Sequence, residues 1–185
     1  MNIPIPQKGH LLIAAPSILT DSSFNRSVIL LTEHTDQNTV GFILNKLTDF
    51  TLTDLIPTSN CDFRVFEGGP VEQDNLYFVH KLPQLIPESI EIGNGLYWGG
   101  DFETVLELIE KGTIGAKQIR FFLGYSGWAS KQLSEELALD SWLCNENQYP
   151  HIFNVDIATF WKNHLLKVGG AYTLWANAPA DPSLN

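Results

Sequence analysis

One segment of the chain, residues 124–128 (GYSGW), has the residue types of a hydrolase nucleophile turn. In the Gly-x-Ser-x-Gly elbow, a serine occupies a sharp turn between a strand and a helix, and the second glycine leaves room for that turn. An apolar run precedes Ser126 and a helical pattern follows it, but Trp128 stands in place of the second glycine. His80 and Asp101 could complete a triad, because triads are defined by geometry rather than by order. Ser126 and His80 are therefore the candidate catalytic residues, and the missing glycine disfavours them.

A second segment, residues 66–80 (FEGGPVEQDNLYFVH), places two adjacent glycines at the end of an apolar run. A phosphate-binding loop needs glycines that lead into a helix N-terminus, usually with a following Lys and Ser or Thr. Here Gly68 and Gly69 precede Pro70, which has no N–H, and the next element is the strand-like Leu76–Val79. We therefore expect a turn or bulge between strands, with a backbone that faces a ligand as the alternative.

Three further features could bind a ligand. Gly99-Gly100 precedes Asp101, and we expect this aspartate to cap a helix rather than to leave its N-terminus open to an anion. Arg26 stands beside Asp21, which favours an ion pair that holds the loop; clamping of an anionic ligand is the alternative. The five histidines show no metal-ligand spacing, so we expect no metal and no cofactor.

Charge and composition narrow the function classes. The 185 residues carry 11 basic and 21 acidic side chains, a formal net charge of −10, and no segment is net positive. Nucleic-acid binding depends on Lys and Arg at phosphates, so we expect no direct binding of nucleic acid or of an anionic membrane. The chain has no apolar run long enough to span a bilayer and no convincing signal peptide. Cys61 and Cys144 lie in no metal or redox spacing, and we expect reduced thiols in a cytoplasmic protein, with a disulfide as the alternative.

The hydrophobic pattern predicts strands early in the chain and helices between strands later. Residues 27–32 and 39–44 flank a polar turn and predict a hairpin. Further strands are predicted at 10–14, 63–66, 76–80, 90–92 and 118–123. Helices are predicted from Asp101 to Gly112, from Ser130 through Leu137, and from Asn154 or Asp156 to Gly169. This order predicts one α+β domain over residues 1–185, with a mixed, mainly antiparallel sheet.

Six segments in order resemble the YqgE/AlgH family of bacterial proteins, and together they cover nearly the whole chain. They are residues 9–14 with Pro16, 21–31 with His34, 41–45, 68–71 with His80, 99–101, and 124–128 with Gln132-Leu133. The resemblance implies an α+β domain whose sheet curls into a partial barrel with flanking helices. It implies no known reaction, and the label of transcriptional regulator that members often carry does not come from a DNA-binding motif. Where the family usually has an acid after Gln-Leu, this chain has Ser134, followed by Glu135 and Glu136, which puts in doubt any role assigned to that acid.

The leading hypothesis is a non-catalytic domain that binds a small molecule or a protein partner. The alternatives are a regulator that acts through protein contacts and a hydrolase-type enzyme that uses Ser126 or His80. The residues expected to contact a ligand are Arg26, Asn45, Gly68, Gly69, His80, Tyr125 and Trp128.

Overall fold

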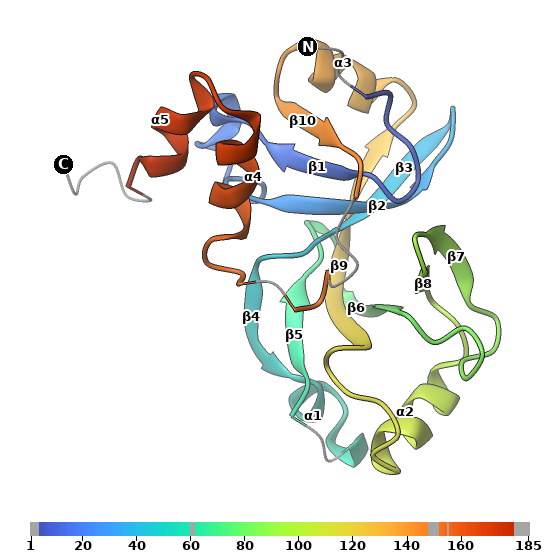
Figure 1. Cartoon of the computed structure of the whole chain (residues 1–185). Coiled ribbons are helices and arrows are strands. Elements are labelled where there is room, and N and C mark those ends of the chain that lie inside the picture. The colour runs from blue at the N-terminus through green and yellow to red at the C-terminus, as the bar shows by residue number, and fades with distance from the viewer. Residues whose placement is uncertain (1–3, 60–61, 148–151, 155, 180–185) are drawn as a thin grey trace.

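The computed structural model describes residues 4–59, 62–147, 152–154 and 156–179. Its strands are β1 (Leu11–Ala14), β2 (Val28–His34), β3 (Asn38–Ile43), β4 (Leu47–Thr51), β5 (Arg64–Glu67), β6 (Val71–His80), β7 (Ile90–Gly93), β8 (Leu96–Trp98), β9 (Ile119–Ala129) and β10 (Trp142–Asn145). Its helices are α1 (Leu52–Leu55), α2 (Phe102–Glu110), α3 (Gln132–Ala138), α4 (Phe160–Val168) and α5 (Tyr172–Asn177) (Figure 1).

The strands form one curled sheet in the order β10-β1-β2-β3-β9-β6-β8-β7, and β5 joins β4 to β9. Every recorded pairing is antiparallel except that of β5 with β9. In the described part of the chain, no ladder joins the end strands β10 and β7, so the sheet does not close into a barrel. The expected α+β fold with a mainly antiparallel, partly curled sheet is confirmed.

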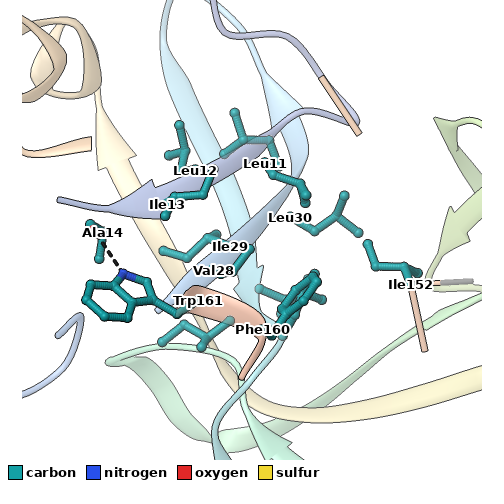
Figure 2. Close-up of a cluster of buried hydrophobic side chains, with 14 of the residues drawn as sticks. Leu11, Leu12, Ile13, Ala14, Val28, Ile29, Leu30, Ile152, Phe160 and Trp161 are labelled. Atoms are coloured by element: carbon teal, nitrogen blue, oxygen red, sulfur yellow. Dashed lines mark hydrogen bonds between the residues drawn. The ribbon is translucent and has the colours of Figure 1, made fainter. Parts of the chain in front are cut away.

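The long strand β9 separates two apolar cores, because successive side chains of a strand point to opposite faces. Phe122 belongs to the core built on β1, β2 and β3, whereas Phe121 belongs to the core beneath α2. Helix α4 covers the first core, where the buried Trp161 donates from Nε1 to the Ala14 carbonyl at 2.8 Å (Figure 2). Figure 1 shows β9 running through both halves of the molecule.

The Gly68-Gly69 segment carries the chain directly over β9. Strand β5 lies along one edge of β9, with Glu67 opposite Leu123, and β6 starts on the other edge, with Val71 opposite Tyr125. A Cβ on Gly68 would stand 2.1 Å from the Gly124 carbonyl oxygen, and one on Gly69 would stand 2.3 Å from the Tyr125 carbonyl group. Gly69 also has a φ of 153°, so only glycine fits this crossing. The expected corner between strands is confirmed, in the form of a close backbone crossing.

Three predicted boundaries are wrong for identifiable reasons. Strand β9 continues to Ala129, because β3 pairs with residues 126–129 after β5 has ended, so residues 124–128 are strand rather than turn. Helix α3 starts at Gln132, since Ser130 donates its hydroxyl to the Asp36 carbonyl instead of capping the helix. Helix α4 starts at Phe160, after a turn in which the Asp156 carboxylate binds the Ala158 amide. The cap at Asp101 and the end of α4 at Gly169 are confirmed.

Replacing Gly68 by alanine is expected to lower the free energy of unfolding by about 3 kcal/mol, because the added methyl group meets backbone that cannot move aside. Urea unfolding measures the loss. Gly115→Ala is the matched control, since a Cβ there meets nothing within 4 Å and is expected to change stability by less than about 0.5 kcal/mol. Equal stability of the two variants would contradict the crossing.

Candidate functional site

Ser126 and His80 are too far apart to form a nucleophile–base pair. His80 lies opposite Ile119 in the β6–β9 ladder, and Ser126 stands seven residues farther along β9. At the rise of a strand this separation is about 23 Å, whereas a nucleophile and its base need hydrogen-bond contact. The buried Ser126 hydroxyl donates to the Gly68 carbonyl at 3.0 Å, which fastens the crossing to β9. The serine has a structural role that accounts for its burial.

His80 is buried at the end of β6, and both its ring nitrogens have partners. The Leu82 amide donates to Nδ1 at 3.1 Å, so Nε2 carries the proton and lies 3.1 Å from the Gly99 carbonyl. Burial lowers the pKa of His80, an effect that the Gly99 hydrogen bond partly opposes. The Asp101 carboxylate accepts from the Thr104 side chain and amide at the start of α2, and these bonds lower its pKa. Neither residue has the arrangement of a triad member.

Arg26 and Asn45 both hold backbone segments together. The Asn45 side chain accepts from the Val28 amide at 2.8 Å and donates to the Arg26 carbonyl at 2.9 Å. The Arg26 guanidinium lies 4.8 Å from the Trp161 ring centroid and donates to the carbonyls of residues 178 and 179. The ion pair expected with Asp21 is wrong, because that carboxylate accepts from the amides of residues 23 and 24. Arg26 fastens the C-terminal segment instead.

The buried Trp128 belongs to an aromatic cluster centred on a single carboxylate. Its indole Nε1 and that of Trp142 both donate to Glu136 Oε2, at 2.8 and 2.7 Å. Phe24 packs against both tryptophans, with ring centroids 6.2 and 5.4 Å away. Tyr125 lies apart, edge-on to Tyr77. Glu136 therefore joins Trp128 and Trp142 through one carboxylate oxygen, a role that the sequence did not predict.

The residues expected to contact a ligand therefore do not converge on one surface. Gly68 and Gly69 are buried in the crossing, Arg26 and Asn45 join backbone segments, and His80 lies at the other end of β9 from Trp128. Their assignment as ligand contacts remains a prediction. Trp128 is adjacent to one pocket, since its register partner Thr39 and its neighbour Ala129 line it.

This pocket measures about 130 Å³ and lies where the turn between β2 and β3 meets the end of β9 and the start of α3. It is lined by His34, Thr35, Asp36, Thr39, Ala129, Lys131, Leu133 and Ser134. His34 Nδ1 and the Thr39 hydroxyl lie 2.7 Å apart, which leaves Nε2 as the free ring nitrogen. Lys131 has a φ of 66°, an unusual conformation for a residue with a side chain.

Sequence reasoning did not find this pocket, because its two walls are about 95 positions apart in the chain. The signals that were available are His34 at the end of an apolar strand and the polar turn that follows it. The bond from Ser130 to the Asp36 carbonyl, at 2.9 Å, joins the two walls.

Neither a metal-binding cluster nor an exposed thiol is present among the described residues. No group of three or more His, Cys, Asp and Glu side chains in them could hold a metal ion. Cys144 is a free, buried thiol, and burial raises its pKa to about 11. Cys61 lies outside the described residues. Among the described helices, none is long and apolar enough to cross a membrane.

Comparison with known proteins shows to which family this chain belongs. Residues 11–173 match the model of the AlgH-like family, DUF179. This chain belongs to the AlgH-like family. A UPF0301 protein of Cytophaga hutchinsonii is 42% identical over 96% of this chain and 98% of its own length. A UPF0301 protein of Bacteroides fragilis is 39% identical over 100% of this chain and 94% of its own length.

Two solved structures share the fold of this AlgH-like chain. A crystal structure of a Corynebacterium diphtheriae protein superposes with a TM-score of 0.75 at 24% identity, covering 96% of this chain and 95% of that one. The solution structure of AlgH from Pseudomonas aeruginosa gives 0.72 at 24% identity, covering 97% and 98%. The resemblance found in the sequence is confirmed.

Glu136→Ala is expected to lower the free energy of unfolding by about 3 kcal/mol, because two buried indole N–H groups lose their acceptor. Urea unfolding followed by tryptophan fluorescence measures the loss. Glu135→Ala, a change at an exposed position of the same helix, is the control and should stay within about 0.5 kcal/mol of wild type. A similar loss in both variants would mean that the shared acceptor at Glu136 is not the cause of the destabilisation.

Lowering the pH from 7.5 to 5 is expected to cost about 2 kcal/mol of stability through His164 alone. Burial lowers the pKa of His164 to about 4, so its imidazole stays neutral in the folded protein down to pH 5. In the unfolded chain the same imidazole takes up a proton below about pH 6.5. Stability therefore falls as the pH falls through this window. Urea unfolding at several pH values should show a shallower dependence for His164→Leu, and an unchanged slope would be inconsistent with a neutral buried His164.

Proposed function

We propose that this AlgH-like protein is a non-catalytic domain that binds a small polar molecule in the pocket between the β2–β3 turn and the start of α3. The observation that carries the proposal is the meeting of an imidazole, a carboxylate, an ammonium and a hydroxyl residue around one small cavity. They are His34, Asp36, Lys131 and Ser134. Within the described ranges, neither Asp36 nor Lys131 forms an ion pair, so their charges are available to a ligand.

Backbone strain supports the same location. A lysine in the left-handed conformation costs of order 1 kcal/mol or more relative to glycine, and strain of this kind concentrates at functional sites. Lys131 keeps this conformation while its carbonyl accepts from the Glu135 amide at 2.9 Å, in the first turn of α3. A chain that needed only to start a helix here would be more stable with glycine.

The pocket also favours binding over catalysis. The candidate catalytic residues Ser126 and His80 are outside its lining, and both have hydrogen-bond partners that account for them. Among the described residues, no carboxylate is bonded to the second ring nitrogen of His34, as one would be to the base of a triad. We also propose, from composition alone, that the protein acts in the cytoplasm and without direct nucleic-acid contact.

A thermal-shift screen against small polar metabolites tests the proposal with the intact chain. At least one compound is expected to raise the Tm of the wild type but not that of Ser134→Trp, in which the indole fills the pocket. Glu135→Trp places the same bulk on an exposed neighbouring position outside the lining and is expected to respond as wild type does. If every stabilising compound acts equally on Ser134→Trp, the pocket is not the binding site.

A further inference from the structure

We infer that the ligand of this pocket is a small zwitterion of the α-amino-acid class, with its ammonium group on Asp36 and its carboxylate on Lys131 and His34. This inference rests on the proposed function and adds the chemical class of the ligand. The two charged residues come from opposite walls, Asp36 from the β2–β3 turn and Lys131 from the connection between β9 and α3.

The two opposite charges suit this class, although both side chains are exposed to water in the absence of a ligand. Asp36 and Lys131 line one cavity without an ion pair between them in the described part of the chain, where pairing would require a nitrogen–oxygen distance of 4.0 Å or less. A ligand with one charge would satisfy one residue and leave the other to water. A ligand that carries both charges close together satisfies both, through charge-assisted hydrogen bonds that are about twice as strong as neutral ones.

The size and the remaining lining limit the ligand further. A pocket of about 130 Å³ is small beside the ~300–1,000 Å³ of common ligand sites, which favours a molecule the size of alanine or serine. Leu133 and Ala129 supply apolar atoms that could face a short side chain, and Ser134 supplies a hydroxyl. His34 Nε2 can donate to the carboxylate in the tautomer whose Nδ1 accepts from the Thr39 hydroxyl. A nucleotide or a peptide would extend out of this pocket, which is partly open to solvent.

Three probes of nearly equal size separate the charges. L-alanine carries both, L-lactate replaces the ammonium by a hydroxyl, and L-alaninamide lacks the carboxylate. Titration of the wild type, followed by amide chemical shifts, is expected to give an affinity for alanine at least about tenfold above that for either analogue. Asp36→Asn should abolish the preference for alanine over lactate, and Lys131→Gly the preference for alanine over alaninamide.

The glycine variant also separates binding from folding. Lys131→Gly relieves a left-handed residue, so its urea midpoint should equal or exceed that of the wild type while alanine binding falls. Asp140→Gly is the matched control, because Asp140 also has a positive φ of 52°, at the other end of α3, and lies outside the lining. It should gain stability in the same way and bind alanine as the wild type does.

Two results would overturn the inference: equal affinities for the three probes, or alanine binding that both charge variants retain. If a compound of another class stabilises the wild type but not Ser134→Trp, while alanine does not bind, the zwitterion is wrong and the proposed function stands. If no compound distinguishes wild type from Ser134→Trp, both the ligand class and the proposed function fail.

Discussion

The fold depends on the passage of the Gly68-Gly69 backbone across β9. On one side of the crossing, β5 runs parallel to β9; on the other, β6 runs back antiparallel to it. The Gly68 carbonyl accepts from the Ile43 amide and from the Ser126 hydroxyl, both at 3.0 Å, so the crossing is fastened to β3 and to β9. Because β9 has a different core on each face, this contact joins the two halves of the molecule.

The crossing accounts for residues that resemble a hydrolase in the sequence. Gly124 must be glycine because its φ is 66° and a Cβ there would stand 2.5 Å from the Gly69 carbonyl oxygen, and Ser126 donates its hydroxyl to the Gly68 carbonyl of the crossing. Glycine and serine therefore occur here for close packing of backbone at the crossing and not for a turn between a strand and a helix. Gly124 and Ser126 match the first part of the elbow pattern, but Trp128 departs from it and the pairing of β3 with residues 126–129 makes this segment a strand.

The sequence correctly predicted features that depend on interactions between residues close together in the chain. The cap at Asp101, the hairpin of β2 and β3, and the glycine that ends α4 each depend on residues near in sequence. The length of β9 and the role of Arg26 could not be predicted, since β9 is extended by a distant strand and Arg26 binds carbonyls about 150 positions away. The pocket was missed for the same reason. Its His34 and Lys131 look ordinary until the fold brings their segments together.

Most of the segments that carry the family resemblance lie where separate backbone segments contact one another or where a helix begins. Residues 68–71 and 124–128 make the crossing, Asn45 and Arg26 connect backbone segments, and Asp101 starts α2. Two solved structures of 24% identity superpose with this chain at TM-scores of 0.72 and 0.75, so the fold persists at low sequence identity. Asp36 and Lys131 lie outside the segments that carry the resemblance, and in the proposed function they would determine the specificity of the pocket.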